Sequence, residues 1–127
     1  MPFARLTLSP AQSSDLVQRL TGDLTSLIAG DLGKRHELTA VLVETPAPAR
    51  WTIGAAAYEV AAHLEVCVTL GTNTDAEKSG FVRNAMHLLR QAMPTLATAT
   101  YVVVKELPAT NWGYDGETQA ARAMTGR

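Results

Sequence analysis

VLVETPAPARWTIGA (residues 41–55) and VVVKELPATNWGYDG (residues 102–116) follow the same pattern. Each stretch begins with three apolar residues, continues into a polar pair and a proline-containing turn, and then reaches a tryptophan. Trp51 and Trp112 lie 61 positions apart, and the first valines of the two stretches have the same separation. A fixed interval of this kind indicates an internal repeat. The sequence therefore predicts two pseudo-repeats, at about residues 1–60 and 61–127.

The first half predicts a strand, a helix and a second strand. Residues 3–8 alternate apolar and polar side chains, which is typical of a strand with one packed face. Ser9 and Pro10 form a helix-start signature, because serine is a favoured cap and proline a favoured first helical residue. A stripe of leucines at helical spacing follows. We expect Gly30 and Gly33 to end this helix and residues 38–44 to form the second strand.

The second half repeats this scheme. Residues 64–70 alternate like the first strand, and the stretch Thr-Asp-Ala-Glu at 74–77 is a capping box. An apolar stripe then continues until Pro94, and residues 100–106 are the expected closing strand. Two β-α-β units with right-handed crossovers predict an α+β fold with a four-stranded mixed sheet and two helices on one face.

The open face of such a sheet would carry apolar side chains, among them Phe3 and Tyr101. Closed symmetric association is the usual way to cover a face of this kind. We therefore expect one domain over residues 1–127 that assembles with copies of itself.

Composition excludes several classes of function. Of the 127 residues, 46% are hydrophobic and 18% are charged, and the net charge is −1, so a nucleic-acid-binding surface is disfavoured. The chain lacks an apolar run of membrane-spanning length. A single cysteine, Cys67, excludes an internal disulfide framework, and the three histidines lack metal-ligand spacing. We expect a cytoplasmic protein with no bound metal.

Pro2 stands directly behind the initiator Met1. As the first residue of a strand it can be purely structural, because no ladder N–H is needed there. Removal of Met1 would instead expose a secondary amine, and α-amino groups titrate at about 7.7–8. Burial lowers such a pKa, and a neutral amine is a usable base or nucleophile. A retained Met1 would leave an unreactive amide. In the repeat, Pro2 aligns with His63 or Leu64.

Pro2, the β-α-β unit and the tryptophan within ELPATNWGYDG together resemble the tautomerase superfamily. The duplication makes the chain similar to the double-length, fused 4-oxalocrotonate tautomerase-like members, and the resemblance covers nearly all of it. It implies a processed N-terminal proline that acts as general base and a pocket between halves or subunits. It also implies a homotrimer with its sheets turned inward, and chemistry that uses no cofactor and no metal.

The sequence departs from the family pattern in its charged residues. One arginine position that the resemblance implies is occupied by Ala40 and Tyr101 in the two halves, and the carboxylate that activates water in the dehalogenases is missing. The neutral donors Asn73, Asn111 and Tyr114 remain as expected substrate-binding residues. Such donors can polarise a carbonyl oxygen.

Two further residues are candidates for the substrate-binding site. Trp112 is expected to wall the pocket or, alternatively, to pack at a subunit interface. Arg50 is either a relocated cation for the substrate or a solvated turn residue.

These observations favour a cofactor-independent keto–enol tautomerase, an isomerase that acts on a small carbonyl or enol substrate. Two alternatives stay open. One is a relative of the decarboxylase or dehalogenase type. The other is a trimeric binding protein that has kept the fold and lost the chemistry. Neither a nucleic acid nor a membrane is expected as a partner.

Overall fold

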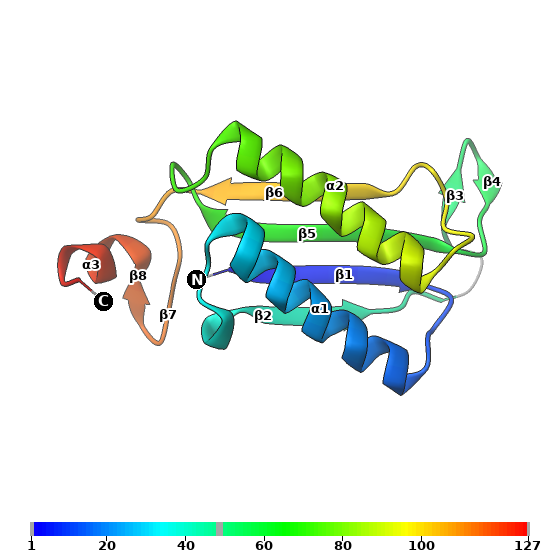
Figure 1. Ribbon diagram of the computed structural model, residues 1–127, viewed down its shortest axis with the longest axis horizontal. Helices are drawn as coiled ribbons and strands as arrows, with labels where there is room; N and C mark the ends of the chain where they lie inside the picture. The colour runs from blue at the N-terminus through cyan, green and yellow to red at the C-terminus, as the bar shows by residue number, and fades with distance from the viewer. Residues whose placement is uncertain (1, 48–49, 127) are drawn as a thin grey trace.

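The computed structural model describes residues 2–47 and 50–126 of the chain. Its centre is a mixed four-stranded sheet in the order β2-β1-β5-β6, shown in Figure 1. Strands β1 and β2 are parallel, β5 and β6 are parallel, and the central pair β1 and β5 is antiparallel. The strands are β1 (Phe3–Ser9), β2 (Ala40–Glu44), β5 (Ala61–Thr69) and β6 (Tyr101–Leu107).

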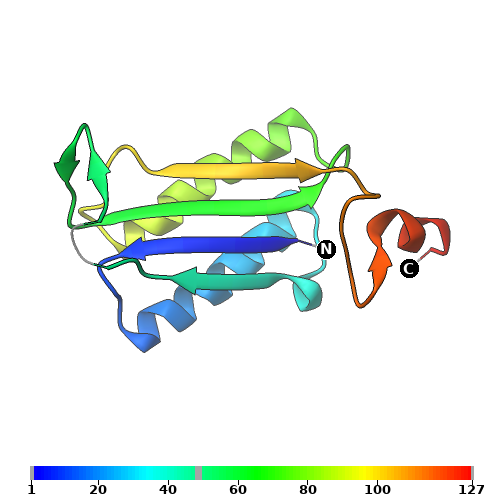
Figure 2. The same ribbon diagram turned by 180° about the vertical axis from the view of Figure 1, so that it is seen from behind.

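Two long helices, α1 (Ser14–Leu32) and α2 (Asp75–Ala92), cover one face of this sheet. From behind, Figure 2 shows that the other face carries no helix. A short 3-10 turn, η1 (His36–Leu38), leads into β2. The predicted α+β class, with a mixed sheet and both main helices on one face, is confirmed. No helix within the described residues is long and apolar enough to cross a bilayer.

The core lies between the helices and the sheet. Strands β1 and β5 direct their even-numbered side chains toward the helices, as the period-two pattern predicted. Helix α1 contributes one side chain about every turn from Leu20 to Leu32, and α2 contributes Phe81, Ala85 and Leu89. All of these side chains are buried.

A short hairpin follows each half of the sheet, and the two hairpins repeat one another. In the first, the backbone N–H of Tyr58 donates to the carbonyl of Trp51 over 3.0 Å. In the second, the N–H of Gln119 donates to the carbonyl of Trp112 over 2.9 Å. The hairpins lie at opposite ends of the sheet in Figure 1. They consist of β3 (Thr52–Ile53) with β4 (Ala56–Ala57), and of β7 (Gly113–Tyr114) with β8 (Glu117–Thr118), which leads into helix α3 (Gln119–Met124).

The first helix starts later than the sequence predicted. Ser9 is still part of β1, where it is buried and its hydroxyl donates to the carbonyl of Glu59 over 3.5 Å. The cap is Ser13, whose Oγ accepts from the N–H of Leu16 over 3.1 Å. The prediction of Ser9 and Pro10 as the helix start was therefore wrong, because the strand extends through Ser9. Of the two glycines expected to end this helix, Gly33 is the cap, with a left-handed φ of 65°, whereas Gly30 lies within the last turn of α1.

The repeat interval changes by one residue in the first strand. Phe3 and His63 occupy equivalent places in the two parallel ladders, each paired with the first residue of the strand that follows the helix. Pro2 is therefore equivalent to Ala62, not to His63 or Leu64, the two alternatives that the sequence left open. The pleat excludes His63, because even-numbered residues of both first strands must face the helices, and the register of the two parallel ladders excludes Leu64.

The predicted capping box at residues 74–77 begins helix α2. The hydroxyl of Thr74 accepts from the N–H of Glu77 over 3.1 Å, and the Glu77 carboxylate accepts from the N–H of Thr74 over 2.8 Å. We predict that Thr74→Ala lowers the free energy of unfolding by about 1 kcal/mol, the usual loss for a cap. Urea denaturation measures this. Ser26→Ala, an exposed change within α1, is the control and should not destabilise. Equal midpoints for T74A and the unchanged protein would contradict the prediction.

Candidate functional site

The start of β1 lies at the same end of the sheet as the ends of β5 and β6. Antiparallel pairing sets Phe3 opposite Cys67, so Pro2 lies beside the last residues of β5. The Pro2 side chain is fully buried, and its carbonyl accepts a hydrogen bond from the N–H of Ala40 over 3.3 Å. The residue that the sequence singled out as the catalytic amine is thus held in the structural core. Met1 lies outside the described residues.

Trp112 lies at this end too. Its indole Nε1 donates to the hydroxyl of Thr69, the last residue of β5, over 3.2 Å. The turn before it is closed by a hydrogen bond of 2.9 Å from the N–H of Asn111 to the carbonyl of Pro108. The structure therefore brings Trp112 and Pro2 to the same end of the sheet, although the two residues are separated by most of the chain.

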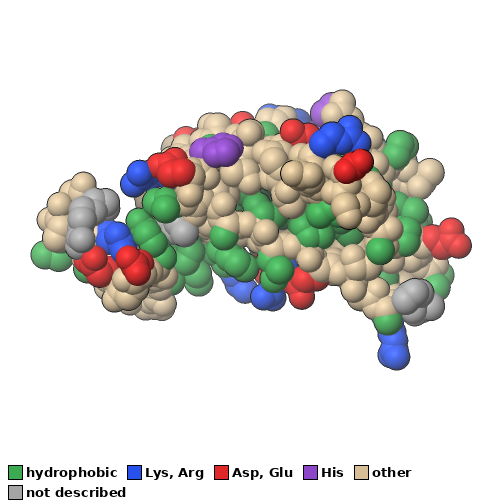
Figure 3. All heavy atoms as spheres, turned by 90° about the horizontal axis from the view of Figure 1, so that it is seen from below, with side chains coloured by type: hydrophobic (Ala, Val, Ile, Leu, Met, Phe, Trp, Pro, Cys, Tyr) green, Lys and Arg blue, Asp and Glu red, His purple; other side chains and the backbone are tan. Residues whose placement is uncertain are grey.

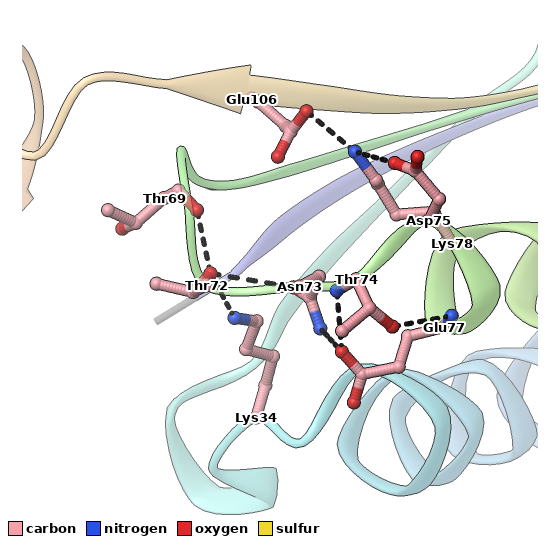
Figure 4. Close-up of polar contacts among 9 residues, drawn as sticks. All are labelled: Lys34, Thr69, Thr72, Asn73, Thr74, Asp75, Glu77, Lys78 and Glu106. Atoms are coloured by element: carbon pink, nitrogen blue, oxygen red, sulfur yellow. Dashed lines mark hydrogen bonds and ion pairs between the residues drawn. The ribbon is translucent and has the colours of Figure 1, made fainter.

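A polar network links the turn after β5 to the end of α1, as Figure 4 shows. The Asn73 side-chain amide donates to the carbonyl of Leu32 over 2.8 Å and to the Glu77 carboxylate over 3.4 Å. The hydroxyl of Thr72 donates to the carbonyl of Thr69 over 2.6 Å and accepts from Lys34 Nζ over 2.8 Å. Asn73, an expected substrate-binding residue, thus holds two helices and a turn in place.

Lys34 was not identified in the sequence. It follows the helix-ending Gly33, and its ammonium group lies in the network shown in Figure 4. Burial lowers the pKa of Lys34 below its usual range, and the attraction of the Glu77 carboxylate opposes this shift. The only sequence signal was its position after the glycine that turns the chain toward the second strand.

Lys78 is a second cation of this region. Its ammonium group contacts Glu106 near the end of β6 at 2.9 Å and Asp75 in its own helix at 3.5 Å. The hydrogen bond to Glu106 raises the pKa of Lys78, while burial acts in the opposite direction. This ion pair ties the start of α2 to the strand that leads into the Trp112 turn.

Tyr114 and Asn111 belong to the segment beyond β6. The Arg122 guanidinium carbon lies 3.8 Å from the centre of the Tyr114 ring, and its Nη2 donates to the Tyr114 carbonyl over 3.0 Å. The ring is thus stacked against α3. Asn111 is exposed, beside a hollow of about 290 Å³ that Trp112 also lines.

The structure separates Arg50 from Pro2. Arg50 lines a hollow of about 420 Å³ together with Thr7, Trp51 and His63. Thr7 and His63 are paired near the end of β1 and the start of β5, whereas Pro2 lies at the start of β1. Within one chain, Arg50 is therefore at the far end of the sheet. Among the described residues, no group of three or more histidine, cysteine, aspartate and glutamate side chains could hold a metal ion.

The hydrogen bond from Trp112 to Thr69 provides a test of how the indole is held at the end of β5. We predict that Thr69→Val, which keeps the shape and removes the acceptor, lowers the free energy of unfolding by about 0.5–1.5 kcal/mol. Urea denaturation measures the loss, and acrylamide quenching in a W51F background should show a more accessible Trp112. Thr7→Val, a matched change in β1, is the control. Unchanged stability and unchanged quenching in T69V would show that the bond does not hold the indole.

No family model matches this sequence, and a search of curated proteins found no match. Solved structures do match the fold. Native fused 4-OT has a TM-score of 0.86 at 19% identity, covering 98% of this chain and 99% of that one. Pt0534 inactivated by 2-oxo-3-pentynoate has a TM-score of 0.87 at 12% identity, covering 98% of this chain and 99% of that one.

A macrophage migration inhibitory factor-like protein from Entamoeba histolytica has a TM-score of 0.78 at 20% identity, covering 92% of this chain and 97% of that chain. Identities this low establish the fold alone. The fold is the one that the resemblance predicted: this chain has the same double β-α-β fold as native fused 4-OT and Pt0534.

Proposed function

We propose that this chain is a cofactor-independent keto–enol tautomerase in which the amine of Pro2, freed by removal of Met1, is the general base. The observation that carries the proposal is the placement of Pro2. It is fully buried at the start of β1, at the end of the sheet where Trp112 and Lys34 also lie. Desolvation of an amine disfavours its protonated form, so the Pro2 nitrogen is expected to be largely neutral near pH 7.

The proposed reaction moves one proton. The Pro2 nitrogen takes a proton from the enol oxygen or from the carbon next to a carbonyl, and the protonated amine then returns it at the other atom. Negative charge develops on the substrate oxygen between the two steps. A cation or a fixed hydrogen-bond donor aimed at that oxygen stabilises the transition state.

Lys34 is the cation that we assign to this task. It comes from the segment that joins α1 to β2. The start of β2 lies beside Pro2, because the N–H of Ala40 donates a hydrogen bond to the Pro2 carbonyl. Partial burial of the Lys34 side chain, which lowers its pKa, strengthens its attraction for an anionic oxygen or carboxylate. Asn111 and Tyr114 are proposed as further donors, Trp112 as an apolar wall, and Asn73 as the residue that holds the turn.

The solved relatives support this choice of chemistry. 2-Oxo-3-pentynoate inactivates Pt0534. This compound is an electrophilic 2-oxo acid, so an amine in an equivalent place is a reasonable target for it. We therefore use it below as a probe of Pro2.

One observation favours a second candidate, a binding protein that has lost the chemistry. The Asn73 amide already donates to Leu32 and Glu77, so this expected donor is occupied within the chain. Nothing in the described geometry favours the decarboxylase or dehalogenase alternative over the other two. The experiment on Pro2 separates an enzyme from a binding protein.

We further propose that the protein is a homotrimer with its open sheet faces turned inward. That face exposes Phe3, Leu42 and Tyr101, the last with 66% of its surface accessible. Figure 3 looks at the molecule from below, along the sheet and not onto its open face, and shows hydrophobic side chains on this side with charged groups above and below them. Two of the matched structures are described as trimers of fused 4-OT, one symmetric and one asymmetric.

Activity on a simple enol such as phenylenolpyruvate tests the role of Pro2. We predict that the processed chain is active and that a form with retained Met1 is slower by at least about 10²–10⁴-fold, the usual contribution of a general base. The rate of the processed chain should rise with pH up to the pKa of the amine and then level off, because only the unprotonated amine accepts a proton. Mass spectrometry identifies the two forms.

Pro2→Ala is the matched variant, since processing leaves it a primary amine and some activity should survive. 2-Oxo-3-pentynoate should modify one site per chain, at residue 2, because Ala62 is joined to the chain by a peptide bond. Equal rates for the two forms of the chain would overturn the catalytic role of Pro2. Absence of activity in the processed form would favour the binding protein.

Assembly is tested by charge insertion on the open face. We predict about three chains per particle by analytical ultracentrifugation at micromolar concentration, and dissociation in Tyr101→Arg, because three buried like charges would repel one another. Val82→Arg places the same charge on the helix-covered side, where Val82 is 38% exposed, and should leave the trimer intact. A monomeric parent chain would refute the assembly.

A further inference from the structure

The end of the sheet opposite Pro2 is the second copy of the candidate site. Trp51 corresponds to Trp112, and the same backbone hydrogen bond closes both hairpins. The start of β5 corresponds to the start of β1, with the buried Ala62 in the place of Pro2. The nitrogen of Ala62 is a peptide amide, so this end lacks a basic amine and cannot perform the same proton transfer.

This end nevertheless contains a large apolar hollow. Its volume is about 590 Å³, within the range of about 300–1,000 Å³ that is usual for small-molecule sites. Pro10, Pro46, Tyr58 and Val60 are among the side chains that line it. Two hydrogen bonds hold the segment that lines this hollow. The Ser9 hydroxyl donates to the carbonyl of Glu59, and the N–H of Ala97 donates to the carbonyl of Val60 over 3.2 Å.

The second hollow, defined by Arg50, Trp51 and His63, adjoins the first, because Pro46 lines both. Arg50 is exposed and supplies the positive charge of this second hollow. Two carboxylates on the neighbouring strands already have partners within the chain: Glu44 contacts Arg5 at 3.1 Å, and Glu65 contacts His63, which lines this hollow, at 2.9 Å. A guanidinium beside an aromatic ring is a typical receptor for a carboxylate attached to an apolar body.

We propose that the two hollows form a non-catalytic binding site for a small amphipathic monocarboxylate. The carboxylate binds at Arg50, beside Trp51, and the apolar body occupies the hollow lined by Pro46, Tyr58 and Val60. Glu59 lies at the apolar hollow and carries a negative charge, so a second carboxylate on the body of the ligand is repelled. The site therefore selects one anionic group and an apolar remainder.

The experiment uses 4-phenylbutyrate as the probe and its neutral analogue 4-phenylbutyramide as the comparison. In a W112F background, the only tryptophan emission comes from Trp51. Titration with the acid should change this emission in a saturable way, and calorimetry on the full chain should give the same dissociation constant. Arg50→Gln should weaken binding about tenfold or more, and the amide should bind more weakly than the acid.

Two matched variants separate the parts of the site. Arg90→Gln removes an exposed charge from α2 and should leave the affinity unchanged, whereas Ala11→Phe fills the apolar hollow and should weaken binding of both probes. Prior modification of Pro2 with 2-oxo-3-pentynoate should not alter binding, nor should retention of Met1.

These controls keep the inference independent of the proposed tautomerase activity. The inference is overturned if 4-phenylbutyrate does not bind, if it binds without a change in Trp51 emission, or if R50Q binds as tightly as the parent chain. It is also overturned if modification at Pro2 abolishes binding, because the ligand would then occupy the catalytic end.

Discussion

The antiparallel pairing of β1 with β5 determines where the functional features of this chain lie. Each half is a β-α-β unit that buries only one face of its two strands, and neither half would be a complete sheet alone. Because the central strands run in opposite directions, the start of one half lies beside the end of the other. Pro2 therefore lies at the same end of the sheet as Thr69 and Trp112 from the second half, while Ala62 lies at the end occupied by Trp51. Each end of the sheet is built from both repeats.

The two ends have diverged in chemistry while keeping the same frame. Both tryptophan turns retain the same closing hydrogen bond, and both hairpins contain adjacent residues with positive φ, Gly54 with Ala55 and Asp115 with Gly116. The end at Pro2 has a residue that can supply a free amine, together with Lys34 from the segment after α1 and Lys78 from α2. The other end has a peptide amide, an exposed arginine and an apolar hollow. Proton transfer at one end and binding at the other are the functions that we propose for them.

The electrostatics of the Pro2 end differ from what missing arginines suggested. Lys34 and Lys78 both lie in this region, but their environments differ. Lys78 is neutralised by Glu106 and Asp75, so its main effect is to fix α2 against β6. Lys34 contacts a neutral hydroxyl and is partly desolvated, which leaves its charge less compensated. In the processed chain that we propose, burial at the start of β1 would favour the neutral form of the Pro2 amine.

The sequence by itself determined the repeated strand-helix-strand order, the buried faces of β1 and β5, the capping box at Thr74 and the candidate amine at Pro2. These features depend on side-chain periodicity and local hydrogen bonding, which short stretches of sequence encode. The start of α1, the equivalence of Pro2 with Ala62, and the grouping of Trp112 with Lys34 but not with Arg50 were decided only by the tertiary structure. They depend on strand register and on the direction in which β1 pairs with β5, and these are set by contacts between residues far apart in the chain.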